Sequence, residues 1–377
     1  MVAGEKIRLY PTDAQVQVFK KYCGAARFVY NACLAEKIRA YQGDSISLSK
    51  FELNEYAASL KHQEEHSWLK EISSGVVTIA SQDVSSAFNL FFKRGNKGFP
   101  KFKKKGKCKE SFGLLNIVGH CKFVDSTHLK LSKIKEPVRI KEHWITSKML
   151  NPRVSFDGKF WYFSFSYEVA ESKPVEDGEI IGVDLGIKSL AVTSDGVVYD
   201  NVNKSKRVKQ LERRKRHLQR QLSRKYEKNK DGRKYVKTNN IIKLEQEIRL
   251  IDRKLRNIRD TYIHTVTTDI VKPKPYKVVI EDLNVSGMMK NRHLSRSIQQ
   301  QEFYKFRQYL TYKCQFNGVQ LKVADRFYPS SKTCSCCGYK RKFLSLSERV
   351  FVCPECGLEM DRDLNAAINL KNYALAQ

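Results

Sequence analysis

The chain has 377 residues, of which 70 are lysine or arginine and 40 are aspartate or glutamate, so its net charge is +30. A charge of this size favours a polyanionic partner, because phosphates attract basic side chains and release counterions on binding. The N-terminus has no apolar signal region, and no apolar run approaches the ~18 residues that a membrane span needs. We therefore expect a cytoplasmic nucleic-acid-binding protein of two or three domains, and neither a secreted nor a membrane protein.

The first half of the chain combines strand-like and helix-like patterns. A strand is predicted for residues 6–10, and helical spacing of apolar residues then continues intermittently to about Lys93. From about Ser111 to Val169 the pattern is typical of strands, and Asp157-Gly158 between two such runs signals a hairpin turn. We therefore expect residues 1–177 to form a β module with a helical insertion, separate from the rest of the chain.

The second half begins with three short strand patterns, and residues 179–199 are predicted to form a meander. Two long helices come next. The first is basic, and the second has apolar residues that step by 4, 3, 4, 3 and 4 from Leu244 to Tyr262, which predicts packing against a partner helix. Strands at 277–281 and 319–324 and a helix from Asp363 complete the predicted order.

Basic residues are concentrated in two segments. Residues 204–237 contain 16 lysines and arginines against 3 acids, and residues 101–109 contain six lysines. The positive charges in such a segment repel one another unless phosphate groups neutralise them, so we expect nucleic-acid contacts. A solvated face or a flexible contact loop would give the same pattern. The expected contact residues are Lys101, Lys103, Lys104, Lys105, Arg213, Arg214, Arg216 and Arg220.

Three carboxylates stand at the ends of predicted elements in the second half. Asp184 and Glu281 each close an apolar run, and Asp363 opens the last helix. One acid in such a place is usually a surface residue or a helix cap, and position alone does not separate Asp363 from Asp361. Acids in a meander, helix, strand order match the sheet of RNase H-like nucleases, in which carboxylates hold two Mg²⁺ ions ~4 Å apart for phosphodiester cleavage.

Ten cysteines are present, and five of them fall within residues 334–356. Cys334, Cys337, Cys353 and Cys356 form two Cys-x₂-Cys pairs separated by 15 residues, which is the spacing of a four-thiolate zinc site. A glycine directly after each pair can supply the left-handed turn of a metal-binding knuckle. Cys336 is surplus and could compete with Cys337. We expect one structural Zn²⁺, because four thiolates leave no open coordination position.

The chain resembles TnpB, the transposon-associated family of RNA-guided nucleases that is ancestral to type V CRISPR effectors. The resemblance covers nearly the whole length, and its sharper motifs lie in the second half. These motifs are Gly182-Val183-Asp184-Leu185-Gly186, Ile280-Glu281-Asp282-Leu283-Asn284, Pro329-Ser330-Ser331-Lys332-Thr333-Cys334 and Asp361-Arg362-Asp363-Leu364-Asn365-Ala366-Ala367, with earlier ones at 8–11, 26–31 and 98–103.

The resemblance implies a multidomain α+β protein. It implies a RuvC nuclease domain, RNase H-like, with Asp184, Glu281 and Asp363 as the Mg²⁺-binding catalytic triad. Asp363 is preferred to Asp361 because the family's third acid stands two residues before an asparagine, here Asn365. The implied domains are a wedge-type β-barrel at 1–10 and 95–177, a helical recognition insertion at 11–94, the RuvC domain at 178–330 and 357–377, and a zinc ribbon at 331–356.

The resemblance also implies partners and an activity. The family pairs a guide RNA from the transposon end with double-stranded target DNA beside a short adjacent motif, and Gln82 falls near a family position that faces this motif. We therefore expect an RNA-guided, Mg²⁺-dependent DNA endonuclease, a monomer with one RNA, which joins the nucleoid when on target. Two alternatives stay open: an RNA-guided DNA-binding repressor without cleavage, as in relatives that have lost the acids, and a guide-independent structure-specific nuclease. A strand-transferring transposase fits the acids but not the resemblance.

Overall fold

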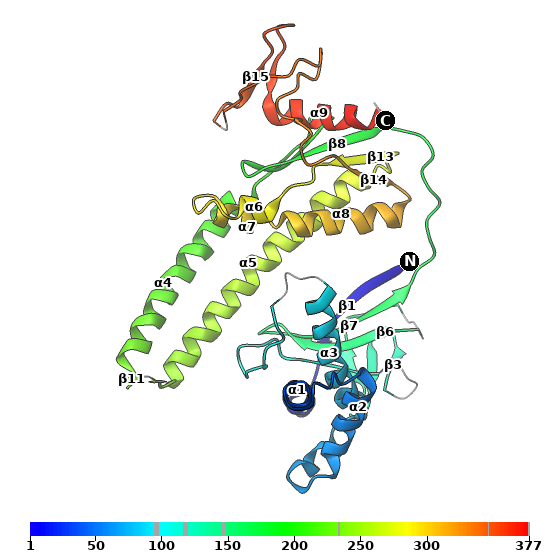
Figure 1. Ribbon diagram of the computed structural model, residues 1–377, viewed down its shortest axis with the longest axis vertical. Helices are drawn as coiled ribbons and strands as arrows, with labels where there is room; N and C mark the ends of the chain where they lie inside the picture. The colour runs from blue at the N-terminus through cyan, green and yellow to red at the C-terminus, as the bar shows by residue number, and fades with distance from the viewer. Residues whose placement is uncertain (94–97, 116–119, 145–147, 233, 346, 376–377) are drawn as a thin grey trace. The chain divides into compact units, whose positions relative to one another are not determined.

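The computed structural model describes residues 1–93, 98–115, 120–144, 148–232, 234–345 and 347–375 (Figure 1). The chain divides into two compact units, Met1–Ala170 and Glu171–Gln377. Both contain helices and sheets, as the predicted α+β class requires. The finer domain boundaries stay predictions, and the one at residue 95 lies outside the described residues.

The first unit is built on an antiparallel sheet of seven strands among the described residues, in the order β2-β6-β7-β1-β5-β4-β3. The N-terminal strand β1 lies inside this sheet, between β7 and β5. The hairpin predicted at Asp157-Gly158 joins β6 to β7, and Gly158 has the positive φ, 98°, that this turn requires. The strand bounds are β1 Val2–Tyr10, β2 Ser111–Gly113, β3 Cys121–Asp125, β4 His128–Leu131, β5 Val138–Ile140, β6 Leu150–Phe156 and β7 Trp161–Glu168.

The helices of the first unit come between β1 and β2 in the sequence. They are α1 (Asp13–Asp44), α2 (Lys50–Ser59) and α3 (Ser74–Lys93), with the short 3₁₀ turns η1 (Leu60–His62) and η2 (Glu64–Glu71) before α3. Thr12 caps α1 in a capping box with Gln15, so the helix begins shortly after β1 ends at Tyr10. Phe19 of α1 then packs against Phe112 and Trp161 of the sheet, which joins helices and sheet in one core.

Within its described residues, the second unit contains a five-stranded sheet in the order β10-β9-β8-β13-β14. The strands β8 (Ile180–Leu185), β9 (Ser189–Thr193) and β10 (Val198–Asp200) form the predicted antiparallel meander. The strands β13 (Lys277–Ile280) and β14 (Gln320–Val323) then add in parallel beyond β8. The carboxyl ends of β8 and β13 therefore meet at one edge of the sheet.

Helices cover both faces of this sheet (Figure 1). Ile181 and Val183 of β8 pack on α5 (Asn239–Val271) and α8 (Phe303–Asn317). Ile180, on the opposite face of the same strand, packs with residues of α9 (Arg362–Leu375). Because side chains alternate along a strand, Gly182 and Asp184 share the face that α9 covers.

The predicted helical pair is α4 (Lys206–Lys228) and α5, and the apolar stripes of the two helices pack together. No helix among the described residues has the length and apolar character needed to span a bilayer. The remaining elements of the second unit are η3 (Val202–Lys204), β11 (Lys230–Asp231), β12 (Lys234–Tyr235), α6 (Val285–Met288), α7 (Ser295–Gln301), β15 (Val350–Val352) and β16 (Glu359–Asp361).

Gly182 allows α9 to approach the sheet closely. A Cβ added to this residue would lie 2.0 Å from the carbonyl oxygen of Ala367 and 2.5 Å from the amide nitrogen of Lys371, both backbone atoms of α9. Because the added methyl group would overpack this contact, Gly182→Ala is expected to destabilise the second unit by about 3 kcal/mol or more. Thermal unfolding checks this. Gly4→Ala is the control because nothing lies within 4 Å of its added Cβ, and equal melting temperatures for the two variants would contradict the packing role.

Candidate active site

Asp184 and Glu281 lie side by side at the edge where β8 and β13 end. Ile280 pairs with Val183 in the parallel register, so Glu281 follows β13 at the level of Asp184. The two side chains point to the same face and form a hydrogen bond with each other. This juxtaposition comes from strand register alone, although the two residues are far apart in sequence.

Asp363 reaches the same place from α9. It stands in the first turn of this helix, over the face of the sheet that carries Asp184. Asp361 has a different role: its Oδ1 accepts hydrogen bonds from the backbone N–H groups of Asp363 (2.9 Å) and Leu364 (3.1 Å), which caps the helix. The structure thus assigns the cap to Asp361 and leaves the Asp363 carboxylate beside Asp184, held by Arg362 at 3.1 Å.

Asp184 is the buried member of this acid cluster, with only 8% of its surface exposed. Burial is the first cause that raises its pKa well above the usual range, followed by the charges of Glu281 and Asp363 and the hydrogen bond with Glu281. The guanidinium of Arg362 acts in the opposite direction. A divalent cation would relieve this repulsion, so the donor set fits such an ion.

The pKa shift predicts a pH-dependent stability in the absence of divalent ions. Because the folded-state pKa of Asp184 is raised above its unfolded value, its contribution to stability is complete at acid pH and is lost as pH rises through the folded value. Asp184→Asn should therefore melt higher than the wild type at neutral pH in EDTA, with a gap that closes toward acid pH. Melting curves across this range check the sign. A variant that melts lower than the wild type at neutral pH would contradict it.

A buried hydrogen-bond network fixes Glu281. The hydroxyl of Ser330 donates to Glu281 Oε1 at 2.7 Å. Asn369 of α9 donates to the carbonyls of Ser330 (2.8 Å) and Thr333 (2.6 Å), and Asn365 also donates to Thr333 at 2.7 Å. The two asparagines are buried on one face of α9, four residues apart, so the helix that carries Asp363 also holds the segment that orients Glu281. No sequence pattern assigned these three polar residues a role in the site.

The same segment leads into the four predicted zinc ligands. The Sγ atoms of Cys334, Cys337, Cys353 and Cys356 all lie within 4.8 Å of one another. Cys334 and Cys356 are 3.6 Å apart and Cys337 and Cys353 are 3.5 Å apart, far beyond the ~2.05 Å of a disulfide. Four sulfurs at ~2.3 Å from a tetrahedral Zn²⁺ would be separated by about 3.8 Å, so the thiolates fit this ion.

Two matching turns position these cysteines. The backbone amide of Gly338 donates a hydrogen bond to the backbone carbonyl of Cys334, and that of Gly357 donates to the carbonyl of Cys353, both at 3.0 Å. Both glycines have positive φ, 76° and 73°, as predicted. Among the described residues, no other group of three or more potential ligands converges closely enough for a single ion. The three carboxylates do not gather so tightly, an arrangement compatible with two ions shared between them.

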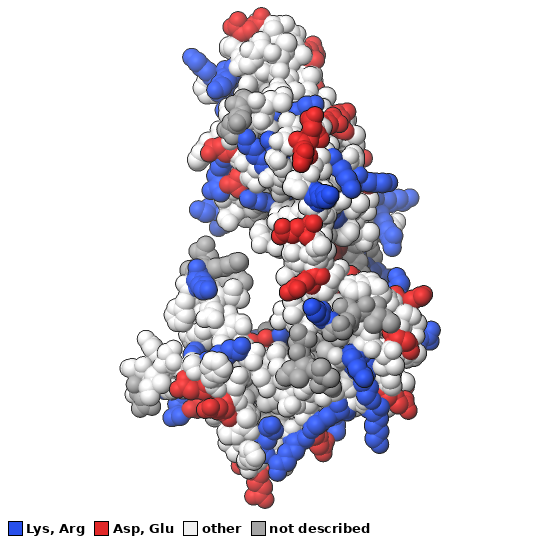
Figure 2. Space-filling model, turned by 90° about the vertical axis from the view of Figure 1, so that its right-hand side faces the viewer, with Lys and Arg blue, Asp and Glu red and all other residues white. Residues whose placement is uncertain are grey.

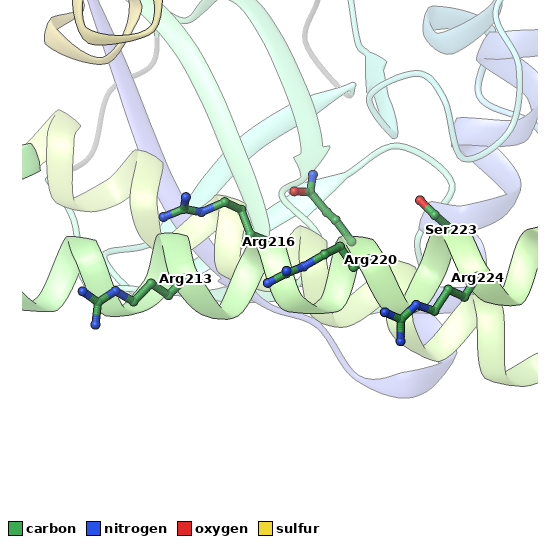
Figure 3. A pocket seen from close by; sticks show the side chains of 6 residues that line it. Arg213, Arg216, Arg220, Ser223 and Arg224 are labelled. Carbon is green, nitrogen blue, oxygen red and sulfur yellow. The ribbon is translucent and has the colours of Figure 1, made fainter.

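The basic helix α4 presents a row of arginines (Figure 3). A hollow along this helix is lined by Arg213, Arg216, Arg220 and Arg224, together with Gln219 and Ser223. The arginines are exposed and spaced by three, four and four residues, so they share one face of the helix. No acid pairs with these four side chains in the part of the chain that the structure describes. On the face shown in Figure 2, by contrast, basic side chains are scattered among acidic and uncharged ones.

The other residues predicted to contact nucleic acid differ in their exposure and in whether a protein group already pairs with their side chains. The guanidinium of Arg214 is paired with Glu247 of α5, so it does not belong to the row. Lys103 lies 3.6 Å from the ring centroid of Tyr30 and 3.9 Å from Asp83. Three neighbouring lysines are exposed, and Gln82 is half-buried on α3. The three exposed lysines are Lys101, Lys104 and Lys105.

Comparisons with known proteins identify the family of this chain. Family models match a helix-turn-helix domain at residues 1–44, a "Probable transposase" at 164–292 and a "Cas12f1-like, TNB domain" at 303–370. A Streptomyces pristinaespiralis protein named "Putative RNA-guided DNA endonuclease" is 31% identical over 376 residues, which cover 98% of this chain and 89% of that protein. The chain belongs to the TnpB family. InsQ of Escherichia coli (strain K12), similarly named, is 30% identical to this TnpB-family chain over 97% of the chain and 90% of InsQ.

One solved structure supports the fold of this TnpB-family protein. The Cas12f1 chain in a complex with sgRNA and target DNA superposes with a TM-score of 0.60 at 16% identity, over 96% of this chain and 83% of that chain. The transposase match contains Asp184, Glu281 and α4, and the TNB match contains the four cysteines and Asp363. The helix-turn-helix match corresponds here to β1 followed by one continuous helix, α1.

Proposed function

We propose that this TnpB-family protein is an RNA-guided, Mg²⁺-dependent DNA endonuclease of a transposon, which cuts DNA next to a short adjacent motif. The observation that carries the proposal is the convergence of Asp184, Glu281 and Asp363 at one edge of the sheet. The names of the relatives support an RNA-guided nuclease. The strand order, an antiparallel meander followed by two parallel strands, supports an RNase H-like RuvC domain at 178–330 and 357–377.

In the proposed mechanism the three carboxylates would hold the metal ions, and Mg²⁺ bound there would supply an activated water and charge neutralisation for phosphodiester cleavage. Asp184, which is buried and repelled by both other acids, is the residue that such a charge would stabilise most. Ser330 holds Glu281 in place, and Arg362 holds Asp363. The ribbon at 331–356 with its Zn²⁺ is then structural. It anchors the Ser330 segment next to the site.

The proposed partners are one guide RNA and double-stranded target DNA, bound by a monomer in the cytoplasm and at the nucleoid. Base pairing between guide and target would choose the sequence, and basic surfaces would hold the heteroduplex by its backbone. The arginine row of α4 is our first candidate for this contact. Lys101, Lys104 and Lys105 are candidates in the first unit, which we assign to a wedge-type β-barrel with a helical recognition insertion, and Gln82 to the adjacent motif.

The arginine row makes a prediction about salt dependence. Replacing Arg213, Arg216, Arg220 and Arg224 by alanine should weaken binding and make the plot of log affinity against log salt shallower, by about one unit of slope per lost phosphate contact. Titrations of heteroduplex at several salt concentrations measure the slope. Arg214→Ala is the matched control, since Glu247 already neutralises it. A quadruple variant with the wild-type slope would contradict the assignment.

Sequencing the RNA that co-purifies with the protein tests the proposed function. We expect one RNA species whose variable end matches the DNA that the complex cuts in Mg²⁺. Removing this RNA should abolish cutting. Undiminished cutting without RNA would instead support a guide-independent nuclease, and binding to intact target DNA without any cutting would support a repressor.

A further inference from the structure

A small cavity adjoins the acid cluster within the second unit. Its volume is about 230 Å³, and Glu281 itself forms part of its wall. Leu185, which follows Asp184, and Ile280, which precedes Glu281, also line it. The cavity therefore adjoins the acid cluster at Glu281, the one carboxylate of the three that lines it. It is smaller than the ~300–1,000 Å³ of drug-sized sites, so it suits a ligand about the size of one ring system.

The wall of the cavity combines apolar and cationic groups. Its apolar part includes Leu185, Ile280 and Phe303, all less than a tenth exposed. Arg307 and Arg326 also line it, and both pair with Asp282, at 2.9 Å and 2.6 Å. Two guanidinium groups share the carboxylate of Asp282, while Glu281 brings a second negative charge to the wall. Each guanidinium also has donors that Asp282 does not use.

Tyr304 is an aromatic residue that lines this cavity but is not packed in the hydrophobic core. Its side chain lines the cavity, yet the residue is 66% exposed. Its neighbour Phe303, at the start of the same helix, is 3% exposed and belongs to the core. The hydroxyl of Tyr304 accepts a hydrogen bond from Gln308 at 3.2 Å, one turn along α8, which holds it at the surface.

We propose that this cavity binds one nucleobase of the DNA strand being cut, next to the scissile phosphate, with Tyr304 as its stacking face. The inference rests on the proposed function, because it takes the acids as the cutting site. An exposed aromatic ring stacks on any base, apolar walls shield the base from water, and the free donors of Arg307 and Arg326 face the charge of the adjoining phosphate. Tyr304 is thus a positioning residue: it places the phosphate at the acids and touches no reacting atom.

The first test needs no cleavage. The protein–RNA complex carrying Asp184→Ala is mixed with single-stranded oligodeoxynucleotides in which 2-aminopurine occupies each successive position around the cut. We expect stacking to quench the fluorescence at one position. Adding Tyr304→Ala to the Asp184→Ala protein should abolish this quenching, whereas adding Tyr304→Phe, which retains the ring, should preserve it. Quenching that survives Tyr304→Ala, or no position-specific quenching in any complex, would overturn the proposal.

The second test is a cycle of cutting rates on intact DNA and on DNA with one abasic site at that position. The wild type and Tyr304→Phe should cut the abasic strand about tenfold more slowly than the intact strand, the size of a lost stacked base. Tyr304→Ala should cut both equally slowly at an unchanged melting temperature. If the ratio of the cutting rates on intact and abasic DNA were the same in Tyr304→Ala as in the wild type, the cavity assignment would be overturned, but the proposed nuclease activity would not. Absence of all cutting in the wild type would instead overturn the proposed function.

Discussion

Asp184→Asn is expected to retain guide RNA and target DNA but to cut at least about a thousandfold more slowly than the wild type. The substitution keeps the size of the side chain and removes the charge that would bind metal at the buried centre of the cluster. Metal ions contribute several kcal/mol of transition-state stabilisation, and each ~1.4 kcal/mol is tenfold in rate. Single-turnover cleavage measured together with target affinity separates loss of chemistry from loss of binding.

Matched acids in the same unit provide the controls. Asp195→Asn makes the same change in an exposed turn of the meander, where the acid accepts a hydrogen bond from Thr193, and should cut normally. Asp361→Asn should also cut normally, because asparagine caps a helix as well as aspartate does. Asp363→Asn should slow cutting as strongly as Asp184→Asn does. Guided cutting at the wild-type rate by Asp184→Asn, or a larger loss from Asp361→Asn than from Asp363→Asn, would reject the triad.

Cys356→Ser is expected to remove the zinc and with it the order of the ribbon. Structural zinc sites carry apparent binding free energies of ~10–16 kcal/mol in isolated zinc-finger peptides, so three remaining thiolates cannot hold the ribbon equally well. The ribbon is joined to the acids through Ser330, Thr333 and the two asparagines of α9, so we expect slower cutting as well. Metal analysis and limited proteolysis of residues 331–356 measure the two effects.

Cys336→Ser is the control for this experiment. Cys336 stands between two ligands in the sequence but lies outside the four-sulfur cluster, and it is exposed. The variant should keep one zinc per chain and normal cutting. Loss of zinc from Cys336→Ser, or one retained zinc in Cys356→Ser, would show that the ligand set is misassigned.

The parts of this structure that depend on short sequence patterns were predictable. The meander follows from three short apolar runs with turn residues between them, and the α4–α5 seam follows from apolar spacing. The two cysteine-containing turns follow from paired cysteines with a glycine after each pair. In each case neighbouring residues specify the local geometry, so no distant partner has to be known.

Features that depend on distant contacts were not predictable from patterns. Asn365 and Asn369 look like polar positions of an amphipathic helix, and only the fold shows that they bind a segment more than 30 residues earlier. Ser330 has no local signal for its contact with Glu281. Local sequence also left Asp361 and Asp363 equivalent. The helix cap separates them in the structure, whereas in the sequence only the family resemblance did.

The most direct test of the account is a guide-exchange cleavage measurement. Purified protein carrying its own RNA, or the same RNA with a replaced guide segment, is incubated in Mg²⁺ with plasmids that contain either matching target beside the adjacent motif. We predict that each complex cuts only the plasmid that its guide matches, and that the Asp184→Asn complex binds the same plasmid without cutting it. Cutting that does not move with the guide, or that persists in Asp184→Asn, would contradict an RNA-guided nuclease built on these three acids.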